Sequence, residues 1–132
     1  KKRREYIYMA KRKVPGYDDI VQTVIAGIQE KKGKQIVIID LRKNEGAVCD
    51  AFIICHGDSS RQVDAIADSV MRFAWEKLRM HSHHVEGLEN LQWVLVDLEG
   101  IVVHIFQKKF RDFYQLEELW SDNHTVALAD VY

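Results

Sequence analysis

The 132-residue chain contains only two cysteines, one proline and no long apolar segment. The cysteines, Cys49 and Cys55, fit neither a CxxC redox motif nor a zinc-binding spacing, so we expect two reduced thiols that pack as small core residues. No apolar run approaches the roughly 20 residues of a membrane-spanning helix. The chain opens on four basic residues with no apolar stretch behind them, which predicts no secretory leader. These absences favour a cytoplasmic protein over a membrane or secreted one.

Repeats and low-complexity segments are also absent, and the composition, 47% hydrophobic and 30% charged, is that of one globular domain. A chain of this length can bury a single core without disulfide staples. Pro15 and Gly16 separate a basic arm, residues 1–15, which we expect to be flexible, from a domain over residues 16–121. Residues 122–132 are predicted to form a C-terminal tail.

Charge is distributed unevenly along the chain. Residues 1–13 hold seven basic side chains and one acidic one; subtracting these from the totals of 19 and 20 leaves residues 14–132 with 12 basic and 19 acidic groups, a net charge of −7. Such an acidic body is a poor direct binder of nucleic acid, whose affinity depends on neutralised phosphates, and suits a basic protein partner. The basic arm either contacts RNA or is simply solvated.

Hydrophobic spacing predicts eight helices and strands. A helix is expected between Asp18 and Gly33, a second, long one from the Gly57–Ser60 turn to Leu78, and a short amphipathic one at the end. Around them the pattern predicts five strands, near residues 35–41, 51–55, 84–86, 92–98 and 101–107, with Glu99-Gly100 as a two-residue hairpin turn. This order predicts a single-domain α/β/α sandwich with a mixed, roughly five-stranded sheet.

The turn from Gly57 to Arg61 lies between a strand and a helix, where backbone N–H groups can cradle a phosphate. A Gly-Ser turn in this position is also typical of nucleotidyltransferase folds. The commoner interpretation is that Asp58 or Ser59 caps the helix, and we favour it. A nucleotide-binding sensor or nucleotidyltransferase-like enzyme built on this turn is the alternative.

A nucleotidyltransferase also needs two carboxylates on one strand face to hold a divalent metal. The pair Asp97 and Glu99 has that spacing, but it lies on the distant hairpin, and Glu99 is in the turn itself. Asp64 and Asp68 are a turn apart on the long helix, which is typical of a solvated face. We therefore predict no enzyme activity, no cofactor and no catalytic metal.

Histidines offer two further candidates. His81, His83 and His84 resemble a metal-binding tract, but Glu86 is the only other ligand nearby, and a polar loop is the favoured interpretation. His104 lies within a strand of core residues, on the same face as Phe106. It is either a buried, hydrogen-bonded histidine or one displayed on an open sheet face, and both alternatives stay open.

Aromatic side chains crowd the end of the domain and cannot all lie on one helical face. Exposed aromatic residues beside an arginine are typical of interface hot spots. Spacing indicates core positions for Phe110 and Leu119, and interface positions for Trp93, Tyr114 and Trp120.

Several separated motifs resemble the ribosomal silencing factor (Iojap) family, in the right order and over about residues 17–121. They comprise the Gly57–Arg61 turn, Val85–Leu88, Trp93–Asp97, Val102–Phe106 and Arg111–Trp120. The resemblance implies a fold like that of a nucleotidyltransferase without the catalytic carboxylates. It implies a non-enzymatic factor that binds the large ribosomal subunit through large-subunit protein fourteen, sterically blocks association with the small subunit, and represses translation under nutrient limitation.

The resemblance also implies self-association away from the ribosome and a set of partner-binding residues. Carried over to this chain, these are Trp93, His104, Phe106, Arg111, Tyr114, Glu117 and Leu119. One departure is Asp58, which stands where the family usually has threonine. Its charge would repel a phosphate and makes a phosphate role for the turn less favourable.

Overall fold

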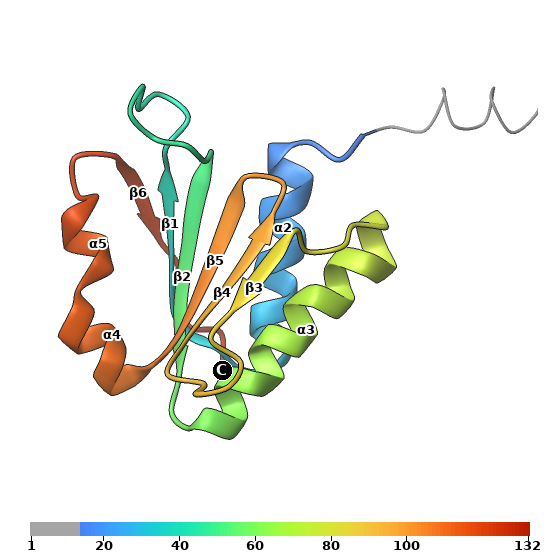
Figure 1. Ribbon diagram of the computed structural model, residues 1–132, viewed down its shortest axis with the longest axis vertical. Helices are drawn as coiled ribbons and strands as arrows, with labels where there is room; N and C mark the ends of the chain where they lie inside the picture. Colours follow the sequence, from blue (N-terminus) through green and yellow to red (C-terminus); the bar gives the residue numbers. More distant parts are fainter. Residues whose placement is uncertain (1–13) are drawn as a thin grey trace, which may run out of the picture.

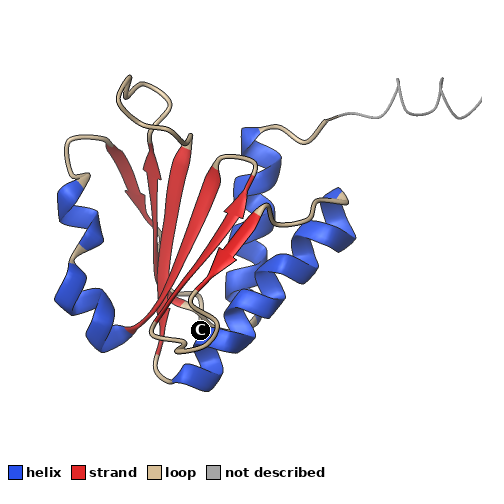
Figure 2. Ribbon diagram, in the orientation of Figure 1, coloured by secondary structure: helices blue, strands red, loops and turns tan. Residues whose placement is uncertain are grey.

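The computed structural model describes residues 14–132, so the predicted arm lies outside the described residues except for Val14 and Pro15. The fold has three layers (Figure 1). One layer holds helices α2 (Tyr17–Glu30) and α3 (Ser60–Leu78), and the opposite layer holds the short helices α4 (Lys108–Tyr114) and α5 (Leu116–Leu119). The sheet lies between them (Figure 2). The predicted α/β/α sandwich is therefore confirmed.

The sheet has six strands, one more than predicted. They are β1 (Lys34–Asp40), β2 (Ala51–Gly57), β3 (His84–Glu86), β4 (Trp93–Leu98), β5 (Ile101–Gln107) and β6 (His124–Ala127). Their order is β3-β4-β5-β2-β1-β6, in which β2 and β5 are parallel and the other neighbours are antiparallel. The sheet is thus mixed, as the sequence predicts.

The sixth strand lies in the segment predicted to be a tail. β6 runs antiparallel to β1, with Asp40 opposite His124 and Val37 opposite Ala127, and the backbone N–H of Leu128 donates to the carbonyl of Ile36 at 2.9 Å. Periodicity misses it because the strand is short and all four of its residues are exposed at the sheet edge, so no apolar alternation marks it. Residues 124–128 are therefore part of the folded domain.

The tight turn between β4 and β5 follows the prediction. Glu99 and Gly100 both have positive φ, 53° and 85°, the backbone that a two-residue primed turn requires. The Asp97 carboxylate accepts a hydrogen bond from the Gly100 N–H at 3.2 Å. This turn sets the register in which Leu95 lies opposite His104, and so decides which side chains share a sheet face.

The main core lies between the sheet and the α2–α3 layer. α2 and α3 approach closely because Gly27 has no side chain: a Cβ there would lie 3.1 Å from the Val70 Cα. The buried Ser69 hydroxyl donates to the Gly27 carbonyl at 2.7 Å across the same contact. Within residues 14–132 no helix is long and apolar enough to cross a bilayer.

A second, smaller core lies on the other sheet face, under α4 and α5. Its buried residues are Ile39, Leu41, Ile54, Phe106 and Leu116. The terminal helix predicted as one piece is broken into two, because Gln115 adopts a left-handed backbone with φ of 47° between them. The break turns the chain so that α5 continues over the sheet.

Candidate functional site

Trp93 and His104 lie side by side on the sheet face that carries α4 and α5. The indole N–H of Trp93 donates to His104 Nδ1 at 3.0 Å. Because an indole nitrogen can only donate, neutral His104 must carry its own proton on Nε2. Only 4% of His104 is exposed, and burial lowers the pKa of His104 to about 4, so the ring is neutral at physiological pH. Of the two alternatives predicted for His104, the structure selects the buried, hydrogen-bonded histidine.

A chain of aromatic rings runs outward from this pair. Trp93 stacks on Phe106 at 4.8 Å between ring centroids and contacts Tyr114 of α4 at 5.0 Å. On the other side, Phe52 meets His104 edge-on at 4.7 Å and Trp120 edge-on at 5.3 Å. We call Phe52, Trp93, His104, Phe106, Tyr114 and Trp120 the aromatic cluster. It connects β2, β4 and β5 with the last residue of α4, Tyr114, and with Trp120, which directly follows α5.

Large apolar side chains stand above this cluster on the outer side of α4 and α5. Phe113 and Leu119 are each 77% exposed and Tyr114 is 47% exposed. Phe113 packs edge-on against Tyr114 at 5.1 Å, which leaves much of both rings in solvent. Exposed aromatic and aliphatic groups held on an ordered base are typical of protein interaction surfaces.

Arg111 fixes the α4–α5 segment to the sheet. Its Nε donates to Glu117 Oε1 at 2.9 Å, and its Nη1 donates to His56 Nδ1 at 2.9 Å and to the Lys34 carbonyl at 3.3 Å. Burial and the adjacent guanidinium of Arg111 lower the pKa of His56, which keeps this ring neutral and able to accept. One buried arginine therefore ties together α4, α5, β1 and β2.

These contacts revise the roles expected for the predicted site residues. Tyr114 and Leu119 are exposed and Trp93 and Glu117 are partly exposed, so all four are available to a partner. Phe106, His104 and Arg111 are buried, and direct contact by them is not available in this structure. They support the surface from beneath: Phe106 packs under Trp93, and His104 and Arg111 hold their neighbours by hydrogen bonds.

Spacing assigned the terminal aromatics only in part. Phe110 packs against the second core as predicted, whereas the core position predicted for Leu119 is wrong. Trp120, expected at an interface, packs on Phe52 at the rim of that core. Phe113 was not identified at all. The break at Gln115 explains the differences at Leu119 and Trp120, because both residues follow it and it interrupts the helical period on which the prediction was based.

The Gly57–Arg61 turn is a helix cap. Ser59 is the N-cap of α3, and its hydroxyl accepts a hydrogen bond from the Gln62 N–H at 3.1 Å. The Gln62 side chain folds back over the turn, where its Oε1 accepts from the Asp58 N–H at 2.7 Å. A Cβ on Gly57 would lie 3.1 Å from that side chain. Two N–H groups of the turn are thus used within the protein, and Ser59 caps the helix as the capping interpretation predicts.

The candidate metal ligands are used in separate contacts. His81 stacks on Trp75 at 4.4 Å, His83 pairs with Glu99 at 2.7 Å, and His84 pairs with Glu86 at 3.0 Å. Among residues 14–132, no group of three or more metal-binding side chains comes together. Both cysteines are free, and burial raises the pKa of Cys55 to about 12, so this thiol is unreactive.

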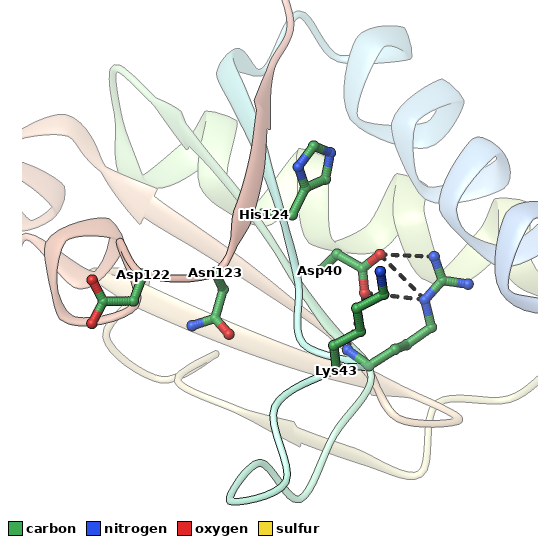
Figure 3. Close-up of a pocket in the computed structure, with 6 residues that line it drawn as sticks. Asp40, Lys43, Asp122, Asn123 and His124 are labelled. Atoms are coloured by element: carbon green, nitrogen blue, oxygen red, sulfur yellow. Dashed lines mark hydrogen bonds and ion pairs between the residues drawn. The ribbon is translucent and has the colours of Figure 1, made fainter.

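A hollow of about 540 Å³ lies away from these residues, between the β1–β2 loop and the start of β6 (Figure 3). It is lined by Asp40, Arg42, Lys43, Asp122, Asn123 and His124. Two of its charged groups form an ion pair with each other, in which Arg42 Nη2 donates to Asp40 Oδ2 at 2.7 Å. The charge balance and the absence of a nucleophile in the lining give no indication of a catalytic pocket.

Comparison with known proteins decides the family. Residues 15–132 match the family model described as "Ribosomal silencing factor during starvation". The chain belongs to the ribosomal silencing factor family. A relative from Halalkalibacterium halodurans, named "Ribosomal silencing factor RsfS", is 39% identical over 113 residues, which cover 86% of this chain and 95% of the relative.

Two further similarities extend this assignment. A crystal structure of a protein from Bacillus halodurans superposes with a TM-score of 0.72 at 37% identity, over 84% of this chain and 99% of that one. A more distant mouse relative, 24% identical over 76% of this chain and 45% of its own length, is named "Mitochondrial assembly of ribosomal large subunit protein 1". The family match reaches Tyr132, so the segment predicted as a tail belongs to the family pattern, in agreement with β6.

Proposed function

We propose that this chain binds the large ribosomal subunit and sterically prevents association with the small subunit, which represses translation when nutrients are scarce. The observation that carries the proposal is the group of exposed apolar side chains on α4 and α5, in a chain of the ribosomal silencing factor family. The name of the mouse relative supports the large subunit as the target. Steric exclusion needs an occupied surface and no chemistry, so the proposed action is not enzymatic.

The docking surface in this proposal consists of Trp93, Phe113, Tyr114, Glu117 and Leu119. Trp93, Phe113 and Tyr114 lie on or beside the aromatic cluster, and Glu117 and Leu119 follow on α5. Aromatic anchors of this kind dominate binding free energy when a partner excludes water from them. Because their supports, His104, Phe106 and Arg111, are already buried and hydrogen-bonded or packed, little ordering entropy is lost on docking.

The proposed partner within the subunit is large-subunit protein fourteen. The net charge of −7 over residues 14–132 suits a basic protein, since complementary charge steers the encounter and disfavours wrong partners. Glu117 brings a carboxylate to the docking surface, although Arg111 already neutralises part of its charge. We also propose that a second copy of the chain covers the same exposed apolar side chains when the protein is off the ribosome. The proposed location of the protein is the cytoplasm.

Co-sedimentation with isolated large subunits tests this function. We expect the chain to comigrate with large subunits and to prevent their joining to small subunits in a sucrose gradient. The double variant Phe113→Ala and Leu119→Ala should weaken binding at least about tenfold, since truncating hot-spot residues costs upward of 1 kcal/mol each. Both side chains are mostly in solvent, so the fold should be unaffected.

The control is Val48→Ala, which truncates a fully exposed apolar side chain in the loop between β1 and β2, away from α4 and α5. It should bind as the unmodified chain does. Comigration that is lost equally in both variants, or in neither, would contradict the assignment of this surface.

A further inference from the structure

Trp93, a member of the proposed docking surface, lies at the very end of a strand ladder. It is the first residue of β4 and lies opposite Phe106, the last pair of the β4–β5 ladder on that side. The end of a ladder opens more easily than its middle. The Trp93 ring nevertheless depends on an exact position, since its N–H donates to His104 Nδ1 at 3.0 Å and its face stacks on Phe106 at 4.8 Å. Whatever holds this end closed therefore decides how Trp93 is presented to a partner.

Gln107 closes the end of the ladder with two hydrogen bonds. Its backbone N–H donates to the Gln92 carbonyl at 3.0 Å, and its side-chain Nε2 donates to the Leu91 carbonyl at 3.0 Å. The two accepting carbonyls belong to the residues just before Trp93, and Gln107 itself directly follows Phe106. Gln107 is also the N-cap of α4, yet within residues 14–132 its side chain makes no capping hydrogen bond. Its amide is used across the sheet instead.

The segment that Gln107 holds has a strained backbone. We call residues Gly87–Gln92 the β3–β4 loop; the Leu91 N–H donates to the Gly87 carbonyl at 2.9 Å and closes it. Leu91 has a φ of 56°, in the left-handed region that a bulky side chain rarely adopts. Such strain persists only where the surrounding contacts fix it, and it is concentrated at functional sites. Here the fixing contacts are the partial burial of the Leu91 side chain against the main core and the Gln107 amide on its carbonyl.

Gly87 holds the same backbone from the other side. It has a φ of 92°, and a Cβ there would overlap the Trp93 carbonyl oxygen and lie 3.2 Å from the Val94 Cα. The β3–β4 loop thus lies directly against the Trp93 backbone on the side of β3, whereas Gln107 bonds from the side of β5. The peptide that carries the Trp93 ring is therefore fixed on both flanks.

From this arrangement we propose that Gln107 is a positioning residue of the docking surface and acts through Trp93. Its amide holds the Leu91 carbonyl and so keeps the β3–β4 loop in its strained form, and the loop sets the Trp93 backbone so that the indole reaches His104. Without the amide the loop relaxes, and a partner has to order Trp93 on docking, which lowers the affinity. The consequence for binding rests on the proposed function; the consequence for Trp93 does not.

The position of Trp93 is measured by NMR on the full, nitrogen-labelled chain, whose three tryptophans give three indole N–H signals. Trp93→Phe identifies the Trp93 signal by its absence. In Gln107→Ala and Gln107→Glu this signal should broaden or move toward that of a solvent-exposed indole, while the signal of Trp75, in the opposite layer, stays in place. Glutamate keeps the size of glutamine, but its carboxylate cannot donate to the Leu91 carbonyl. A Trp93 signal that is unchanged in both variants would overturn the proposal.

Binding to isolated large subunits measures the consequence for docking in a double-mutant cycle. Gln107→Ala alone should weaken binding about fivefold, the equivalent of one net hydrogen bond. Trp93→Ala should weaken it at least about tenfold. The double variant should lose no more than Trp93→Ala alone, because Gln107 then has no Trp93 ring to position. Losses that multiply in the double variant would show that Gln107 acts independently of Trp93 and would overturn the proposal.

The matched control is Gln22→Ala, which removes a glutamine side chain exposed on α2, in the opposite layer. It should keep both the Trp93 signal and the affinity, and thermal unfolding verifies that each variant is folded. If the unmodified chain does not bind large subunits, the proposed function fails, and the NMR comparison decides the role of Gln107. If Trp93→Ala weakens binding and neither Gln107 variant does, the positioning role fails and the proposed function stands.

Discussion

The indole N–H of Trp93 donates to Nδ1 of His104 at 3.0 Å, and this bond determines where the histidine keeps its proton. The proton is left on Nε2, a buried atom without a hydrogen-bond partner among the described residues. An unpaired buried donor costs roughly 1–3 kcal/mol, so this ring stabilises the fold less than a fully bonded one would. In return, the hydrogen bond from Trp93 to His104 holds the Trp93 ring in place at the docking surface.

His104 makes the stability of the fold depend on pH. Its pKa in the fold, about 4, is below the value of about 6.5 expected when unfolded, so between these values the unfolded chain binds the extra proton. The stabilisation from neutral His104 is complete above pH 6.5 and is lost as the pH falls toward 4. The loss should reach on the order of 3 kcal/mol, measured by urea unfolding between pH 7 and 4.5. His56, whose pKa is also lowered, adds to the same window.

The variant His104→Phe separates the two histidines. It keeps the ring and removes the titrating group, so the fall in stability with decreasing pH should become shallower. What remains should combine the contribution of His56, which has the same sign, with that of His83, whose raised pKa acts in the opposite direction. An unchanged pH dependence in this variant would mean that His104 does not titrate in this window.

Arg111→Ala should lower the free energy of unfolding by about 2–3 kcal/mol. The substitution leaves His56 Nδ1 and the partly buried Glu117 carboxylate without their donor, and the loss of a partner is most costly in buried groups. Arg111→Lys should recover only part of this, because an ammonium cannot reproduce the fork of donors. The control Lys108→Ala breaks an exposed pair and should cost at most about 0.5 kcal/mol. Equal effects of the two alanine variants would contradict the anchoring role of Arg111.

Ser59→Ala should destabilise the fold by about 1 kcal/mol, measured by thermal or urea unfolding. The Ser59 hydroxyl accepts from the Gln62 N–H at the start of α3, and alanine leaves that donor without its cap. Ser60→Ala, one residue later inside the helix, is the matched control and should change the stability by less than half as much. A larger loss of stability in Ser60→Ala than in Ser59→Ala would contradict the assignment of Ser59 as the N-cap of α3.

Removal of residues 122–132 should destabilise the domain by at least about 2 kcal/mol and promote aggregation. The deletion removes β6, exposes the backbone edge of β1, and uncovers the part of the main core on which Leu128 packs. Removal of residues 129–132 alone keeps β6 and loses only outer contacts such as that of Asp130 with the Gln35 N–H. Its effect should be clearly smaller. Urea unfolding and light scattering measure the two consequences.

The sequence predicts most of the main layer of the fold. The apolar period of α2 and α3, the β-branched strands and the Glu99-Gly100 turn are local signals, and each element formed where its signal lies. The helix cap is also a local signal, because the Ser59 hydroxyl bonds to the backbone N–H of Gln62, only three residues later in the chain. β6 and the break at Gln115 were missed because neither has a local signal: one is an exposed edge strand and the other a single residue with positive φ.

What the sequence by itself determined is the fold class and the family resemblance, because these depend on residue type and spacing. Only the tertiary structure decided which of the predicted contact residues reach the surface. His104, Phe106 and Arg111 come from three different positions in the chain and become buried supports, while Phe113 and Leu119 become exposed. The physical reason is that burial depends on neighbours: α4 packs against β2, which lies far from it in the sequence, and such a contact leaves no periodic trace.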